Sequence, residues 1–218
     1  MPEIMKIDPS HTDMAMISEI VRIIKAGGVI AYPTETFYGL GADGENEQAV
    51  EKVFLIKGRN FKNPISLIIG DRKDLTGLVG NITDAAQRLM DEFWPGGITL
   101  VFTASPDISI RLTGGTGKIG IRISSHPIAS ILAKTFSHPI TATSANLSGE
   151  GECKSAGEVI QRLGNRIDAV VDGGPTPGKG GTTILDVSVH PPLIIREGII
   201  PTSLIRDTFR RMSITIRI

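Results

Sequence analysis

The sequence has one cysteine, no net charge and no long apolar run, and each of these shortages excludes a class of protein. Cys153 alone can form neither an internal disulfide framework nor a cysteine-rich metal site. The 23 basic side chains are balanced by 23 acidic ones, whereas a protein that binds nucleic acid over a broad surface usually has a basic excess. Apolar runs such as residues 29–32 are too short to span a bilayer.

The N-terminal segment also lacks the apolar stretch of a signal peptide, because residues 1–13 contain acidic side chains and no such run. We therefore expect a cytoplasmic protein. The chain has 218 residues, of which 40% are apolar and 21% are charged. This composition is that of an ordinary globular domain, and the length is sufficient for a substantial core.

Apolar periodicity and capping residues predict helices and strands that alternate along the chain. Helices are expected at 14–24, at 49–54, after Thr83, from Pro127, after Ser155 with Glu158 as a capping box, and at 203–210. Strands are expected at 29–32, 65–69, 98–103, 119–123, 140–143, 169–172, 183–187 and 193–196, with an edge strand at 212–218.

Some of these strand pairs are separated by turns alone, which favours a mixed sheet over a purely parallel one. We expect a single α/β domain with a twisted mixed β-sheet, flanked by helices. The domain is placed at residues 10–200, and the C-terminal helix and strand at 201–218 should pack on the same domain.

Two glycine-rich loops come close to phosphate-binding motifs but lack essential parts of them. Residues 173–180 nearly match a Walker A loop, yet no Ser or Thr follows the lysine and the next segment is rich in β-forming residues. Residues 114–118 differ in the same way, because Ile119 follows Lys118. We interpret both loops as turns, with about even odds that they also line a ligand site.

Polar residues follow the strand predicted at 29–32. Thr34, Glu35 and Thr36 precede two glycines, and ligands in open α/β sheets usually bind at such strand ends. A polar loop capped by threonine hydroxyls is an equally good interpretation. Further along, Lys57 and Arg59 either complement a helix dipole or grip a polyphosphate together.

Residues 143–149 place small hydroxyls and an amide directly after another strand. Ser144 lacks the Gly-x-Ser-x-Gly surroundings of a hydrolase nucleophile, so neutral donors for phosphate oxygens or an ordinary turn remain the two interpretations. The four histidines have no spacing typical of a zinc site, and no metal site is predicted.

Taken in chain order, these segments resemble the YrdC-like family of threonylcarbamoyl-adenylate synthases. The matching motifs extend over about residues 10–200 and lie at 27–41, 57–59, 63–64, 94–96, 121–122, 126–127, 143–149, 172–175, 182–186 and 196–198. The resemblance implies a twisted mixed sheet with a large concave pocket. The resemblance is to the short form of the family, which has no extra C-terminal domain.

The resemblance also implies an enzyme that converts ATP, L-threonine and bicarbonate into threonylcarbamoyl-AMP and pyrophosphate. A partner complex would transfer the product to tRNA. Residues implied to hold threonine are Thr34, Arg122, Thr141 and Thr182. Residues implied to hold ATP are Lys57, Arg59, Asn63, Thr116, Thr143, Ser144, Asn146 and Arg196.

Lys57 and Arg59 would also offset transition-state charge, and Mg²⁺ would be held mainly by the triphosphate and water. The chain departs from the family pattern at Gly97, Ser124, Cys153, Gly181 and Glu197. These departures leave open a divergent YciO-like paralogue with weak or altered activity. A double-stranded RNA-binding module is a further alternative, because the resemblance implies a family whose members can bind RNA.

Overall fold

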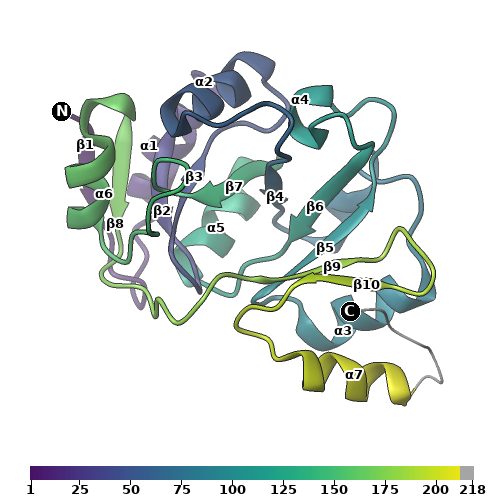
Figure 1. Cartoon of the computed structure of the whole chain (residues 1–218). Helices are drawn as coiled ribbons and strands as arrows, with labels where there is room; N and C mark the ends of the chain where they lie inside the picture. Colours follow the sequence, from purple (N-terminus) through teal and green to yellow (C-terminus); the bar gives the residue numbers. More distant parts are fainter. Residues whose placement is uncertain (212–218) are drawn as a thin grey trace.

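The computed structural model describes residues 1–211 and contains one large mixed sheet flanked by helices (Figure 1). Within that range the strand order is β1-β8-β2-β3-β7-β4-β6-β5-β9-β10. The strands are β1 (Glu3–Lys6), β2 (Ile30–Pro33), β3 (Tyr38–Gly41), β4 (Ser66–Ile68), β5 (Ile98–Thr103), β6 (Lys118–Arg122), β7 (Ile140–Ser144), β8 (Ala169–Asp172), β9 (Thr183–Asp186) and β10 (Leu193–Arg196). The edge strand predicted at 212–218 lies outside the described residues.

The sheet contains both parallel and antiparallel pairs, which confirms the predicted mixed architecture. Strand β8 pairs in parallel with β1 and β2, while β3 is antiparallel to β2 and to β7. On the other side of β7, the β4–β6 and β5–β9 pairs are parallel and the β5–β6 pair is antiparallel. Strand β7 therefore joins the two halves of the sheet.

The helices are α1 (Met14–Lys25), α2 (Glu47–Lys57), α3 (Asp84–Phe93), α4 (Ile110–Thr113), α5 (Pro127–Phe136), α6 (Ala156–Leu163) and α7 (Thr202–Arg210), with short 3₁₀ turns η1 (Arg72–Leu75) and η2 (Gly164–Arg166). Their caps explain several boundaries. Thr83 accepts a hydrogen bond from Ala86 N at the start of α3, as predicted. Ser155 likewise caps α6, but the Glu158 carboxylate accepts from Lys154 N and not from Ser155 N, so only half of the predicted capping box forms.

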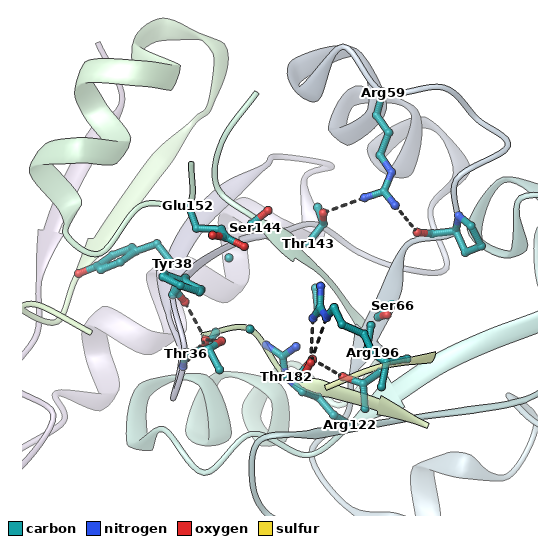
Figure 2. Close-up of a pocket in the computed structure, with 18 residues that line it drawn as sticks. Thr36, Tyr38, Arg59, Ser66, Arg122, Thr143, Ser144, Glu152, Thr182 and Arg196 are labelled. Carbon is teal, nitrogen blue, oxygen red and sulfur yellow. Dashed lines mark hydrogen bonds between the residues drawn. The ribbon is translucent and has the colours of Figure 1, made fainter. Parts of the chain in front are cut away.

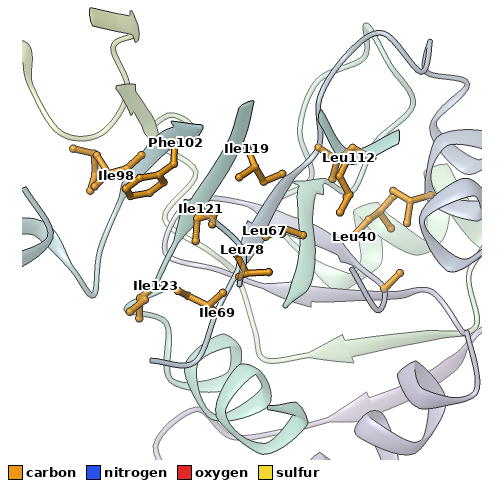
Figure 3. Close-up of a cluster of buried hydrophobic side chains, with 14 of the residues drawn as sticks. Leu40, Leu67, Ile69, Leu78, Ile98, Phe102, Leu112, Ile119, Ile121 and Ile123 are labelled. Carbon is orange, nitrogen blue, oxygen red and sulfur yellow. The ribbon is translucent and has the colours of Figure 1, made fainter. Parts of the chain in front are cut away.

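Two apolar clusters fill the opposite faces of the sheet. In β2, Ile30 and Tyr32 face the cluster under α1 and α5, whereas Ala31 faces the larger cluster on the other side. This is the two-residue alternation of a strand buried on both faces. Figure 3 shows part of the larger cluster, in which Leu67, Ile121 and Phe102 come from three different strands.

The segment predicted as a polar loop at 32–41 is in fact a β-hairpin. Strand β3 pairs along its whole length with β2, in the register Pro33↔Tyr38 to Ile30↔Gly41. Gly39 and Gly41 made this strand look like a loop, because glycine is depleted in strands. At Gly41 the Tyr32 ring explains the choice, since a Cβ there would lie 2.7 Å from Tyr32 Cε1.

Strand β1 was not predicted and lies before residue 10, so the sheet begins earlier than the domain start expected from the sequence. At the other end, Ile205 and Phe209 of α7 are buried in the larger cluster, beside α3 (Figure 1). In the described part of the chain, no helix is both long enough and apolar enough to cross a membrane.

Candidate active site

A polar cavity of about 210 Å³ lies where the β2–β3 turn, the end of β7 and the start of β9 meet (Figure 2). Its cationic lining residues are Arg59, Arg122 and Arg196. Its hydroxyl-bearing lining residues are Thr34, Thr36, Tyr38, Ser66, Thr99, Thr143, Ser144 and Thr182. Among the described lining residues, Glu152 contributes the one carboxylate. Such an excess of guanidinium and hydroxyl groups suits an anionic ligand.

The three arginines are held in different ways. Arg59 donates to Thr143 Oγ1 at 3.3 Å and to Pro64 O at 3.0 Å. Arg196 donates to the carbonyl oxygen of Thr182 through Nη2 at 2.8 Å and Nε at 3.3 Å. Burial lowers the pKa of both guanidinium groups from its ordinary value, which reflects the cost of keeping charge in a half-buried site. An anion bound among them would relieve that cost.

Arg122, at the end of β6, pairs with a carboxylate. Its Nε lies 3.3 Å from Glu35 Oε1, and the two side chains are only 9% and 10% exposed. The other Glu35 oxygen accepts a hydrogen bond from the Ser124 hydroxyl. The adjacent His126 is also largely buried, and desolvation lowers its pKa, an effect that Glu35 partly opposes. Arg122 is therefore held at its Nε edge by an ion pair, without a well-formed hydrogen bond.

Two threonines close the floor of the cavity. Thr34, only 1% exposed, donates to the carbonyl oxygen of Phe37 at 2.7 Å and lies 3.0 Å from the Thr36 hydroxyl. The Thr182 hydroxyl is hydrogen-bonded to that of Thr99 at 2.9 Å. A hydroxyl has two acceptor lone pairs and one proton, so the Thr182 hydroxyl keeps capacity for a ligand. The Thr34 hydroxyl also accepts from Thr36 N at 3.2 Å, so it could bind a ligand only by giving up one of its present bonds.

Lys57 lies behind the cavity wall and does not line it. Its ammonium donates to Ser144 O at 2.6 Å, to Asn146 Oδ1 at 2.9 Å and to Asn146 O at 3.0 Å. All three of its protons are therefore used. Burial, reinforced by the Arg59 charge, lowers the pKa of Lys57 to about 8, so the ammonium is charged at neutral pH. In this structure Lys57 supports the turn at 144–146, and the direct contact with ATP expected of it stays a prediction.

The structure therefore divides the twelve predicted site residues into two groups. Seven line the cavity: Thr34, Arg59, Arg122, Thr143, Ser144, Thr182 and Arg196. Five do not: Lys57, Asn63, Thr116, Thr141 and Asn146.

Structural hydrogen bonds explain the positions of most of the predicted residues that lie outside the cavity. The Asn146 amide donates to Glu150 O at 2.6 Å, and its oxygen accepts from Ser144 Oγ. Thr116 donates to Thr113 O at 2.6 Å within its own turn. Asn63 lies on the turn before β4.

Thr141, predicted to hold threonine, is fully buried in the sheet. Its hydroxyl donates to Leu40 O at 3.2 Å and accepts from Ala42 N at 2.9 Å, which joins β7 to the end of β3. The backbone uses this hydroxyl, so the geometry does not support a ligand contact from it.

Replacement of Thr141 by valine should lower the free energy of unfolding by about 1–3 kcal/mol, because it leaves the buried Ala42 N–H without an acceptor. The KM for threonine, the substrate that the resemblance implies, should not change. Chemical denaturation together with steady-state kinetics would measure both. Thr143→Val is the matched control, since its hydroxyl faces the cavity and should affect ligands more than stability. A large rise in the threonine KM of Thr141→Val would restore the role first predicted.

Several site residues were missed by sequence reasoning. Glu35 stands within the polar motif after β2, but nothing in the sequence indicated that it pairs with Arg122. Ser66, Tyr38 and Glu152 line the cavity from β4, β3 and the loop after β7. Within residues 1–211, no cluster of three or more His, Cys, Asp or Glu side chains is arranged to hold a metal ion.

These features define an α/β protein with a cationic pocket, and comparison with known proteins gives its family. The Sua5/YciO/YrdC family model, described as telomere recombination, matches residues 22–198. The chain belongs to this family, which confirms the resemblance seen in the sequence.

Curated relatives carry the name threonylcarbamoyl-AMP synthase. The Bacillus subtilis protein is 38% identical over 192 residues, which are 88% of this chain and 56% of that relative. The Photobacterium profundum protein is 35% identical over 187 residues, which are 85% of this chain and 100% of that relative. Against the longer relatives from B. subtilis and Pyrococcus abyssi, the chain spans about half of their length, 56% and 52%.

Solved structures show the same fold. The crystal structure of P. abyssi Sua5 complexed with L-threonine superposes with a TM-score of 0.93 at 33% identity, over 98% of this chain and 62% of that one. Escherichia coli YciO superposes with a TM-score of 0.84 at 30% identity, over 92% of this chain and 98% of that one.

Proposed function

We propose that this protein condenses L-threonine, bicarbonate and ATP into threonylcarbamoyl-AMP and releases pyrophosphate. The observation that carries the proposal is the cavity in which three arginines and a set of hydroxyls converge at the strand ends. Its place in the family supports the same activity, because relatives of 35–38% identity are named threonylcarbamoyl-AMP synthase. The complex of P. abyssi Sua5 with L-threonine supports an amino-acid substrate.

Threonine would bind at the end of the cavity formed by Arg122, Thr34 and Thr182. Arg122 offers its guanidinium to the substrate carboxylate, the pairing that its planar donors suit best. Thr34 and Thr182 would take the amine and the side-chain hydroxyl. The cavity volume of about 210 Å³ is small for a ligand site and suits a compact amino acid, so the larger nucleotide would extend beyond it.

The nucleotide would bind along the wall formed by Arg59, Arg196, Thr143 and Ser144, which line the cavity. Arg59 would contact the triphosphate, with Lys57 adding positive charge from behind the wall. The threonine amine reacts with bicarbonate to give a carbamate and water, and the carbamate oxygen then attacks the α-phosphorus of ATP. The pyrophosphate group leaves with the bonding electrons. Positioning and charge neutralisation dominate such a transfer, so no protein nucleophile is required.

Mg²⁺ would enter with ATP and stay coordinated mainly by phosphate oxygens and water, as it commonly is with nucleotides. The product is a mixed anhydride that an amine can attack with release of AMP. We propose a tRNA adenosine as the final acceptor and a tRNA-modifying complex as the partner that receives the product, with RNA contact as a part of that transfer.

The test is a substrate-dependence assay for pyrophosphate. Purified protein with ATP, Mg²⁺, L-threonine and bicarbonate should release pyrophosphate and form threonylcarbamoyl-AMP, identified by mass spectrometry. Omission of threonine should abolish both products. Pyrophosphate release that continues without threonine would contradict the proposal.

The similarity to E. coli YciO supports a second candidate, a paralogue with weak or altered activity. Expression in cells that lack their own threonylcarbamoyl-AMP synthase separates the two. Restored tRNA modification supports the synthase, whereas a well-expressed protein that does not restore it supports the paralogue. RNA binding that persists at high salt without any ATP turnover would instead favour the RNA-binding module.

A further inference from the structure

Ser124 is completely buried between β6 and α5 and lies beside the carboxylate that pairs with Arg122. We propose that Ser124 and Glu35 are positioning residues that fix the orientation of the Arg122 guanidinium for an α-amino acid carboxylate. The inference rests on the proposed function, because it assigns Arg122 to the carboxylate of threonine. It adds two residues that act through Arg122 and need not touch the substrate.

The hydrogen-bond directions define a relay. The backbone N–H of His126 donates to Ser124 Oγ at 3.2 Å, so one lone pair of that oxygen is occupied. The single hydroxyl proton of Ser124 goes to Glu35 Oε2, because an ionised carboxylate can only accept. Glu35 Oε1 is thereby turned toward Arg122 Nε, 3.3 Å away. Each group in the sequence His126 N–H, Ser124, Glu35 and Arg122 fixes the next.

The Glu35–Arg122 contact is an ion pair at 3.3 Å and does not use up the guanidinium. Glu35 Oε1 and Arg122 Nε are both buried, and neither makes a geometrically good hydrogen bond with a described residue. The terminal nitrogens of Arg122 also donate to no described protein atom, yet they are not among the buried unpartnered atoms, so they reach accessible space. Figure 2 shows the Arg122 side chain among the sticks that surround the cavity.

This arrangement is what recognition of a carboxylate requires. A guanidinium group is planar, so fixing its Nε edge also fixes the direction of the two terminal nitrogens. Those nitrogens can then form the paired hydrogen bonds of a bidentate contact. The nearby Arg196 charge would push Arg122 away, and the Glu35 carboxylate opposes that repulsion. Burial lowers the pKa of the nearby His126, which disfavours a competing positive charge beside Glu35.

Loss of the Ser124 hydroxyl would leave Glu35 Oε2 buried without its donor. The carboxylate would then rotate toward another donor and release its hold on Arg122. We expect Ser124→Ala to raise the KM for threonine about tenfold, with kcat and the KM for ATP within about twofold of wild type. A role in the fold alone would lower the melting temperature without this selective change.

Two further variants keep the measurement interpretable. Ser125→Ala changes the exposed neighbour and should leave all three kinetic constants unchanged. Ser124→Cys retains a weak donor in nearly the same volume and should give an intermediate KM for threonine. Melting curves for each variant, with and without threonine, report whether the protein is folded under the assay conditions.

A double-mutant cycle in the Arg122→Lys background tests whether Ser124 acts through Arg122. Lysine has no Nε edge for Glu35 to hold, so Ser124→Ala should change the threonine KM by less than about twofold there. An equal tenfold effect in both backgrounds would overturn the inference while leaving the proposed function in place. So would an unchanged threonine KM in folded Ser124→Ala. A wild-type protein with no threonine-dependent pyrophosphate release would overturn the proposed function and this inference together.

Discussion

Replacement of Arg59 by alanine should lower kcat/KM for ATP by about 10²–10³-fold, the usual cost of losing one preorganised donor to a developing charge. Arg59 lines the cavity directly after the left-handed Gly58 that ends α2. Its two hydrogen bonds, to Thr143 and Pro64, aim the guanidinium along the wall. Because the side chain is not part of either apolar cluster, thermal stability should change little. The rate of pyrophosphate release, measured at a series of ATP concentrations, gives kcat/KM for ATP.

Arg59→Lys should recover only a small part of the loss, because an ammonium group cannot reproduce the planar fork of donors. Arg111→Ala is the matched control. Arg111 also lies beside α2, pairs with Glu51 at 3.4 Å and covers the Phe61 ring, but it does not line the cavity. It should therefore retain kcat/KM. A folded Arg59→Ala protein with wild-type kcat/KM for ATP would refute the role given to this side chain.

Local patterns were sufficient to predict most elements of the fold. The helical spacing of Ile17, Ile20, Val21 and Ile24 corresponds to the buried face of α1, and Pro127 begins α5 as expected. Both depend on interactions within a few residues. Strand β1, which escaped prediction, depends on a distant partner. Strand β1 pairs with β8 in the register Glu3↔Ala169, and no local property of four residues specifies that neighbour.

The site residues divide in the same way, into those recognisable from the local sequence and those whose role depends on distant contacts. Polar residues at strand ends were recognisable from order and spacing, and most of those that were predicted do line the cavity. What each side chain does there depends on contacts between distant segments. Ser124 and Glu35 are 89 positions apart, as are Lys57 and Asn146. The motifs therefore predicted where the site lies. They could not show that Thr141 hydrogen-bonds within the sheet or that Lys57 supports the loop at 144–146.

Lys57→Met should lower both stability and activity, because it removes a donor to three oxygens at once. The methionine side chain keeps most of the volume but leaves Ser144 O, Asn146 O and Asn146 Oδ1 without the ammonium. Relief from burying a charge offsets part of this loss, so we expect about 1–3 kcal/mol in the free energy of unfolding. Urea denaturation measures this free energy of unfolding. It is done at pH 7, where Lys57 with its pKa of about 8 is charged.

The loss of activity should be larger than the loss of stability suggests. Without Lys57 the turn at 144–146 would shift, and a displacement of about 1 Å in a positioning group can cost about 10²-fold in rate. Lys52→Met is the control, since that lysine is on the same helix and donates to Gly27 O at 2.7 Å, far from the cavity lining. The Lys52→Met protein should have a lower free energy of unfolding and an unchanged kcat. Equal losses of stability in the two variants, with kcat unchanged in both, would show that Lys57 is a structural lysine with no part in the reaction. The positive charge that neutralises the triphosphate would then have to come from Arg59, Arg122 and Arg196.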